Sequence, residues 1–258
     1  MKIPYMLLLL TVGHLCATSS IYESFSTEQN RTASWLTDWH RLQGTLTNIP
    51  ESLKIKGLQS KGGALQLLKK GEALAQHRIM IDGSYFGSYR VQASKIKADT
   101  ILGLLLSRPM REGLTPKTAS IGFLAKGWKT DLGVLLVDGV PVKVLEGIGL
   151  SIDQTYLVVF HVVNEGTQKA VTMWILNESQ ASYFASNKVT PAILNAAPLS
   201  RDAGGVLQRV RHQKKKDPNL TIFKGDIVAC VAKYCPDATF DEIRIVSGSL
   251  KEGIGAQK

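Results

Sequence analysis

Hydrophobic positions in this sequence form short blocks that are either continuous or alternate with polar residues. Glycine, asparagine, aspartate or proline stands in most of the gaps between the blocks. Blocks of this length and punctuation are typical of β-strands joined by tight turns. The pattern predicts strands at Ile21–Ser26, Ala64–Leu68, His77–Met80, Tyr85–Gln92, Thr100–Ser107, Ala119–Ala125, Leu132–Val137, Tyr156–Val163, Ala170–Leu176 and Phe240–Val246.

Two of these blocks carry further detail about the sheet. Asp138-Gly139 lies between the apolar triplets LLV and VPV, and this dipeptide in such a setting predicts a two-residue β-hairpin. In the last block, the alternation places Ile243 and Ile245 on one face of a strand and Arg244 on the other. Both features fit antiparallel strands.

Helical periodicity is scarce and is confined to Ser34–Leu42 and Leu250–Gly253. Many short strands without alternating helices predict a sandwich or a closed barrel, not a parallel α/β sheet. The chain has 258 residues, which suits a large two-sheet architecture, and no break in composition divides it. We therefore predict an all-β fold, a two-sheet antiparallel jelly-roll sandwich.

The N-terminus has the order of a secretory signal. Lys2 precedes an apolar run from Met6 to Val12, and small residues follow it up to a cleavage position after Ser19. The run is far shorter than the roughly 20 apolar residues of a membrane-spanning helix, and no other run in the sequence reaches that length. We predict a signal peptide at 1–19, a single domain at 20–258 with no transmembrane segment, and a secreted protein in the periplasm, outside the cell or on its surface.

Cysteine usage follows from this compartment. Removal of the signal takes away Cys16, so the mature chain carries only Cys230 and Cys235. An even pair of cysteines in an oxidising compartment predicts a disulfide. The bond would close a loop of four residues and act as a local staple.

The net charge is +10, and half of it lies in one segment. The segment Arg201–Lys216 carries six basic residues and one acid. No nucleic-acid reading motif accompanies it, so nucleic acid is excluded as a partner. A solvated loop is the favoured interpretation, and contact with an anionic cell-surface polymer is the alternative.

Several segments taken in order resemble a known family. They are YESF at Tyr22–Phe25, TASWLTDWH at Thr32–His40, GGALQL at Gly62–Leu67, HRIMIDGSYFGSYRVQ at His77–Gln92, QTYLVVFHVV at Gln154–Val163, VTMWILNES at Val171–Ser179 and FDEIRIVSG at Phe240–Gly248. This order resembles the secreted concanavalin A-like (laminin-G-like) jelly-roll proteins of planctomycetes and verrucomicrobia. The resemblance covers nearly the whole mature chain. It implies the sandwich fold and the secreted compartment, and it implies a carbohydrate-associated role by analogy.

Catalytic patterns for polysaccharide chemistry are weak in this sequence. A hydrolase needs two carboxylates across one bond, and adjacent Asp241 and Glu242 are predicted to point to opposite faces of their strand. A lyase would need a tyrosine or histidine base beside an arginine. Tyr85, Tyr89 and Arg90 fall in one segment, with His77 and Arg78 nearby, but packing of a half-buried strand is the favoured interpretation.

The sequence does not identify a metal site. The histidines of the mature chain lie apart without paired spacing, and the metal ligands are therefore unknown. A calcium ion at a loop rim is an option, with Asp138, Asn164 and Glu165 as oxygen donors in turns. Asn30, Asn177 and Asn219 begin glycosylation sequons, which matter only in a eukaryotic host.

Sugar binding commonly uses aromatic rings presented beside polar side chains. Trp35 and Trp39 lie four residues apart in a polar stretch, and Trp128 lies in a KGWKT turn; these three are the candidate ligand-binding residues. Trp174 lies within VTMWIL and is expected in the core.

The sequence thus favours a secreted, non-enzymatic binding module whose partner is a polysaccharide or an anionic cell-surface polymer. Two alternatives stay open: a polysaccharide lyase or glycoside hydrolase with an unfamiliar site, and a structural protein of the cell envelope. The oligomeric state has no signal in the sequence.

Overall fold

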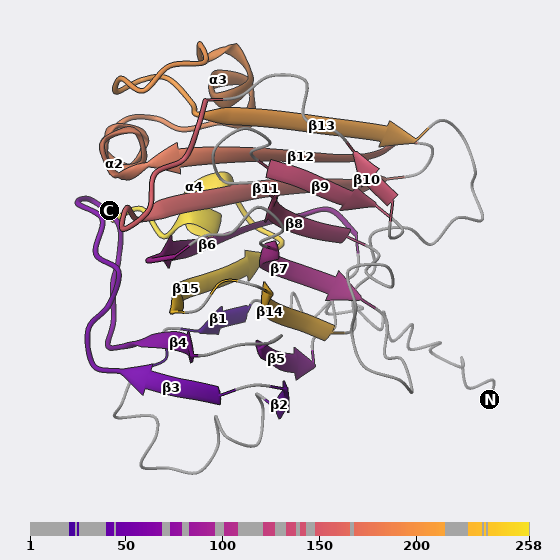
Figure 1. Ribbon diagram of the computed structural model, residues 1–258. Helices are drawn as coiled ribbons and strands as arrows, with labels where there is room; N and C mark the ends of the chain where they lie inside the picture. Colours follow the sequence, from indigo (N-terminus) through magenta and orange to yellow (C-terminus); the bar gives the residue numbers. More distant parts are fainter. Residues whose placement is uncertain are drawn as a thin grey trace, which may run out of the picture.

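Two antiparallel β-sheets face each other in this computed structural model and make up most of it (Figure 1). The structure describes residues 21–23, 25, 40–43, 45–68, 73–78, 83–95, 101–107, 121–126, 133–137, 140–142, 148–165, 168–214, 227–233, 235 and 237–257. Within this part of the chain, no helix is long and apolar enough to span a membrane.

The larger sheet has eight strands within the described residues. Its order is β13-β12-β11-β6-β15-β4-β3, and β1 pairs with the far half of β15 beside β4. The bounds are β1 (Ile21–Glu23), β3 (Thr45–Ile49), β4 (Ala64–Leu68), β6 (Tyr85–Ala93), β11 (Tyr156–Glu165), β12 (Gln168–Asn177), β13 (Gln208–Lys214) and β15 (Ala238–Val246).

The smaller sheet has seven described strands in the order β10-β9-β8-β7-β14-β5-β2. Val137 pairs with Val140, so β9 and β10 form the predicted hairpin, although its two turn residues lie outside the described part. The bounds are β2 (His40–Gln43), β5 (Ala73–Arg78), β7 (Ile101–Ser107), β8 (Ile121–Lys126), β9 (Gly133–Val137), β10 (Val140–Val142) and β14 (Ile227–Lys233).

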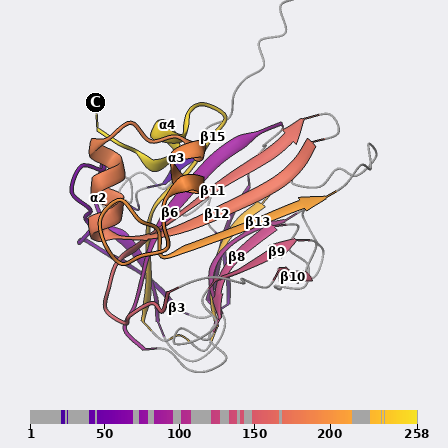
Figure 2. The ribbon, with the colours of Figure 1, turned by 90° about the horizontal axis from the view of Figure 1, so that it is seen from above.

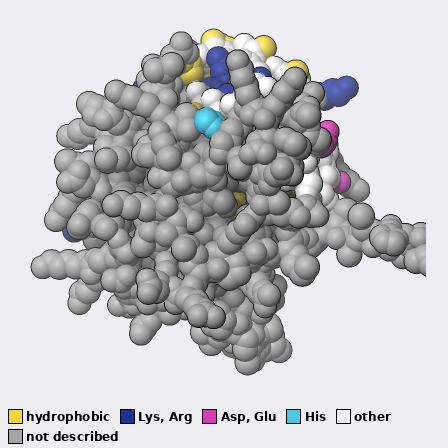
Figure 3. All heavy atoms as spheres, turned by 90° about the vertical axis from the view of Figure 1, so that its right-hand side faces the viewer, with side chains coloured by type: hydrophobic (Ala, Val, Ile, Leu, Met, Phe, Trp, Pro, Cys, Tyr) yellow, Lys and Arg dark blue, Asp and Glu magenta, His cyan; other side chains and the backbone are white. Residues whose placement is uncertain are grey.

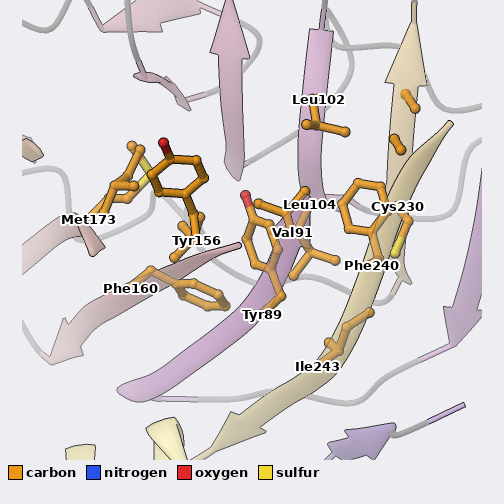
Figure 4. Close-up of a cluster of buried hydrophobic side chains, with 14 of the residues drawn as sticks. Tyr89, Val91, Leu102, Leu104, Tyr156, Phe160, Met173, Cys230, Phe240 and Ile243 are labelled. Carbon is orange, nitrogen blue, oxygen red and sulfur yellow. The ribbon is translucent and has the colours of Figure 1, made fainter. Parts of the chain in front are cut away.

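The main core lies between the two sheets (Figure 4). Alternate residues of β6 and β11 point into it, and Tyr85 packs edge to face on Phe160 with ring centroids 6.4 Å apart. Leu104 of β7 and Cys230 of β14 belong to the same cluster and come from the other sheet. Burial of such alternating side chains supplies the main driving force for this fold.

A second apolar layer covers one half of the outer face of the larger sheet. Three short helices, α2 (Glu178–Ser186), α3 (Pro191–Ala196) and α4 (Leu250–Ile254), gather at one end of β6, β11 and β12 (Figure 2). Trp174 and Val159 are buried beneath them, which confirms the core position expected for Trp174. Strands covered on both faces read as continuous apolar runs, and this explains the sequences of β11 and β12.

The helices arise from local capping that the sequence analysis did not identify. Asn177 accepts a hydrogen bond from the Gln180 backbone N–H, and the Gln180 side chain accepts one from the Asn177 N–H, a capping box that starts α2. Thr190 and Pro191 start α3 in the same region of the chain. Of the predicted helical turns, Leu250–Gly253 is confirmed by α4. The helical turn predicted at Ser34–Leu42 is wrong at its C-terminal end, because His40–Gln43 forms strand β2.

One loop prediction is also wrong. The basic segment Arg201–Lys216 was expected to be a solvated loop, but its part Gln208–Lys214 is β13, an edge strand that pairs with β12. Apolar and polar residues alternate there, with Val210 in the core and Arg209 and Arg211 on the opposite face. Charged side chains on an edge strand discourage pairing with another chain.

Candidate functional site

The outer face of the larger sheet has two halves with different covers. The half toward Ala93 and Asn177 lies under the three helices and under residues 51–61, an irregular segment that we call the strap. In the other half, the described cover ends with Gly253 of α4, which lies against Phe86 and Val246 at the border between the two halves. A ligand can reach only uncovered side chains, so the two halves have different roles.

Buried charged side chains hold the strap to the sheet. Arg90 of β6 donates to the carbonyl oxygens of Leu53, at 2.7 Å, and of Gln59. Asp241 of β15 accepts a hydrogen bond of 2.8 Å from the Leu53 N–H and another from the Ser52 hydroxyl. These contacts satisfy strap backbone groups that no strand pairs with.

Glu242 joins this network, which corrects a prediction. Asp241 and Glu242 were expected on opposite faces, but the strand bulges between Asp241 and Arg244, and Glu242 has φ +50°. Glu242 therefore turns to the strap side as well, where it accepts from the Lys61 N–H at 2.7 Å and pairs with Arg244 at 2.8 Å. The hydroxyl of Tyr22 in β1 also donates to Glu242, at 3.2 Å.

The two carboxylates are closed to ligands despite their proximity. Asp241 is 0% exposed and Glu242 is 1% exposed. Burial raises the pKa of Asp241 to about 7, against hydrogen bonding from Ser52 and the charge of Arg90, which both lower it. The pair therefore anchors the strap and is not placed to act on a glycosidic bond.

A row of side chains crosses five strands, starting at the edge of α4 and running out over the half of the sheet beyond it. Each member lies opposite the next in register, from β15 through β6, β11 and β12 to the edge strand β13. A second row lies beside it toward the open end of the sheet. We call both rows the outer strip: Val246, Phe86, His161, Thr172 and Arg211, then Ser84, Val163, Ala170 and Gln213.

Phe86 and His161 form the centre of the outer strip. Their rings stack with centroids 4.1 Å apart and an interplanar angle of 9°, because the two residues are direct cross-strand partners. Both side chains are half-buried. Burial and the nearby Arg211 lower the pKa of His161, against the opposing charge of Glu165. The imidazole is therefore neutral at pH 7 and can both donate and accept hydrogen bonds.

Arg211 gives the outer strip its exposed positive charge. Two other arginines of the basic segment serve the fold. Arg209 donates to carbonyls at the end of α3, including that of Ala197 at 3.1 Å, and Arg201 donates to the Gly149 carbonyl at 2.7 Å. Lys and Arg side chains gather at the top of the molecule in Figure 3.

Ser84 stabilises the end of the outer strip where β11 ends. Its hydroxyl donates to Glu165 at 2.9 Å and accepts from the Asn164 N–H at 3.0 Å, which ties the start of β6 to the end of β11. Asn164 and Glu165 were calcium candidates together with Asp138, which lies outside the described residues. Among the residues described, no three His, Cys, Asp or Glu side chains come together as a metal site.

The three tryptophans proposed for ligand binding, Trp35, Trp39 and Trp128, lie outside the described residues. Their role stays a prediction.

The disulfide expected between Cys230 and Cys235 is not formed in the structure, where both are buried thiols. Cys230 lies within β14, opposite Leu104 of β7 and Ala75 of β5, whereas Cys235 lies beyond the end of that strand. The Cys235 thiol instead donates to the Lys95 carbonyl at 3.3 Å. Burial raises the pKa of Cys235 to about 12, so the sulfur stays protonated and unreactive.

The lyase candidates are not brought together as a site. Tyr85 and Tyr89 lie in the core between the sheets, where burial raises their pKa, and Arg90 lies on the other face under the strap. His77 and Arg78 lie in β5 of the smaller sheet. The expected packing of the tyrosines is confirmed, whereas the expectation that Arg90 extends to solvent is wrong, since Arg90 is buried under the strap.

The sequon at Asn177 is also structural. The buried Asn177 side chain caps α2 and donates to the Arg201 carbonyl at 3.1 Å, so it is not presented for glycosylation. The sequons at Asn30 and Asn219 lie outside the described residues.

The outer strip as a whole is not predicted from the sequence. One signal was present: His161 is the single polar residue in the apolar run of Tyr156–Val163, and it falls on the face opposite Phe160. The other members of its row come from four other strands. These residues are identified by the pairing register of the strands, and a single sequence does not give that register.

Comparison with family models finds no match, and comparison with curated proteins finds none either. Among solved structures, the chain is similar to the cellulose-induced protein Cip1, with a TM-score of 0.50 and 11% identity over 88% of this chain and 97% of that one. It is also similar to the carbohydrate-binding module CBM66 from Bacillus subtilis (TM-score 0.44, 11% identity, 81% of this chain and 96% of that one). Lectin II from Ulex europaeus is another similar structure (TM-score 0.40, 11% identity, 78% and 98%).

At such low identity the similarity to Cip1 shows the fold alone. Together with the sheet order, it confirms the predicted all-β, two-sheet antiparallel jelly-roll sandwich of the concanavalin A-like type.

Proposed function

We propose that this protein is a secreted, non-enzymatic polysaccharide-binding module and that the outer strip is its ligand surface. One observation carries the proposal: beyond α4 and the strap, the outer face of the eight-stranded sheet presents polar side chains in register, with His161 stacked on Phe86 at their border. Secretion rests on the signal-like N-terminus.

The chemistry of the outer strip supports a saccharide as ligand. Sugar hydroxyl groups both donate and accept hydrogen bonds, and the neutral His161 imidazole and the Gln213 amide can do the same. Half-buried Phe86 and Val163 offer apolar surface between these polar groups, which suits the C–H face of a sugar ring. The fold shared with Cip1 supplies a rigid sheet on which such a surface is preformed.

Binding without catalysis is the better supported class. The adjacent acids of β15, Asp241 and Glu242, are buried under the strap and hold its backbone. The tyrosines of β6, Tyr85 and Tyr89, are buried in the core and stay protonated. The enzyme alternative would therefore need catalytic groups other than these four.

A glycan and polysaccharide array tests the proposal directly. Purified residues 20–258 are applied with and without calcium, at low and high salt. We expect binding to at least one polysaccharide, and we expect His161→Ala and Gln213→Ala to weaken it about tenfold or more, the effect of losing a ligand hydrogen bond. Tyr183→Ala is the matched control, because Tyr183 is exposed on α2, outside the outer strip.

Two results would contradict the proposal. Absence of binding to every polysaccharide would favour the structural role in the cell envelope. If binding survives both strip substitutions and is lost with Trp39→Ala or Trp128→Ala, the protein binds polysaccharide but the outer strip is not its ligand surface.

A further inference from the structure

We propose that the outer strip selects an acidic saccharide and that the ligand's anionic group sits over Thr172, between Arg211 and His161. This inference rests on the proposed function and narrows it to one chemical class of ligand. It concerns a specific place on β11, β12 and β13, not the positive charge of the chain as a whole.

The register places the three side chains side by side. Thr172 of β12 pairs with His161 of β11 on one side and with Arg211 of β13 on the other. Neighbouring strands lie about 4.8 Å apart, so Arg211 and His161 flank a gap of about 10 Å with the Thr172 hydroxyl at its centre. All three residues lie on the same face of the sheet. Arg211 is exposed, His161 is half-buried and Thr172 is 7% exposed, so Thr172 lies lowest, between the other two side chains.

The chemistry of these groups converges on an anion. Arg211 offers a fork of N–H donors, Thr172 an O–H donor, and His161 an imidazole N–H donor. The stack with Phe86 fixes the orientation of the His161 ring before any ligand arrives. A carboxylate is the group whose geometry matches an arginine fork, and charge-assisted hydrogen bonds are about twice as strong as neutral ones.

The two neighbouring arginines show why Arg211 is the ligand group. Arg209, two residues earlier on the same face, donates to the Ala197 carbonyl at the end of α3. Arg244, on the same face of β15, pairs with the buried Glu242. Both are committed to the fold, whereas Arg211 lies exposed on the half of the sheet beyond α4.

The experiment compares two ligands that share one backbone. Polygalacturonate and its fully methyl-esterified form differ in charge and in the methyl group, so they separate recognition of a carboxylate from recognition of the sugar chain. Alginate and chondroitin sulfate extend the test to other acidic backbones and to sulfate. Affinities of residues 20–258 are measured by calorimetry at constant pH and at two salt concentrations.

We expect at least one acidic polymer to bind tenfold or more tightly than the neutral ester. Arg211→Gln should abolish that difference, and Arg211→Lys should restore part of it. Lys188→Gln, which removes an exposed charge near α2 and outside the strip, should leave it unchanged. Circular dichroism and the melting temperature confirm that each variant is folded.

The outcomes separate the two proposals. Equal binding of acid and ester, or binding of neutral glycans alone on the array, overturns the inference and leaves the proposed function standing. An equal loss with Arg211→Gln and Lys188→Gln overturns it as well, because diffuse surface charge then explains the preference. Binding to none of these polymers and to no glycan on the array overturns the proposed function itself.

Discussion

At the scale of single residues, Glu242 departs most from what its strand would impose. It is a buried residue that is not glycine and has φ +50°, a conformation that costs free energy unless the surroundings hold it. Here the Lys61 N–H, the Tyr22 hydroxyl and the Arg244 guanidinium hold its carboxylate. The sequence shows that Asp241 and Glu242 are adjacent, but it does not show the bulge that turns both side chains to the strap.

Asp241 makes stability depend on pH in a direction opposite to that of most acids. Its folded pKa of about 7 lies above the ordinary value of 3.8, so the folded protein holds the proton between these values. The contribution of Asp241 is therefore full below pH 4 and is lost as the pH rises through 7, by on the order of 4 kcal/mol. We expect Asp241→Asn to remove this part of the slope, measured by urea unfolding from pH 4.5 to 8.5. Identical slopes in both proteins, with Glu51→Gln as the exposed control, would contradict the assignment.

Gly87 is required by close packing of the core. A Cβ at this position would lie 2.0 Å from the Phe160 ring, which crosses β6 at that point. We expect Gly87→Ala to destabilise the protein by about 1–3 kcal/mol through overpacking. Combining it with Phe160→Leu should cost less than the sum of the two single changes, as chemical denaturation can measure. Strict additivity would show that the two residues do not compete for the same space.

At the scale of elements, the strands were largely predictable and the covers of the sheet were not. Alternation identified β6, β11, β12 and β15 because one side of each faces the inter-sheet core. The helices α2 and α3 were missed because they are short and depend on a capping box and an N-terminal proline more than on an apolar stripe. β13 was missed because its charged residues concealed the alternation around Val210.

The strap should loosen when its buried anchor is removed. Arg90 donates to two strap carbonyls and lies beside the charges of Asp241 and Glu242. We expect Arg90→Met to cost about 3–5 kcal/mol, because it leaves two strap carbonyl oxygens without their donor and removes a buried positive charge beside Asp241 and Glu242. Hydrogen exchange should then rise at the amides of Leu53 and Lys61 before it rises in β11. Uniform loss of protection across the sheet would show that the strap is not a separate unit.

At the scale of the whole molecule, the two-sheet sandwich could be argued from short strands and turns, whereas the ligand surface could not. The outer strip takes Phe86, His161, Thr172 and Arg211 from four strands that are distant in sequence. Only the register of an eight-stranded sheet brings them together, and only the positions of the helices and the strap leave Arg211 and part of His161 exposed beside them. The segments containing the predicted tryptophans lie outside the described residues and keep their place as candidates.

The ligand surface can be located by recording the side-chain NMR spectrum of the mature protein as polysaccharide is added. If the outer strip is the ligand surface, the imidazole signals of His161 and the methyl signal of Thr172 shift in proportion to bound ligand, while the signals of Tyr183 on α2 stay in place. Saturated binding with unchanged His161 and Thr172 signals would contradict the account and place the site elsewhere on the molecule.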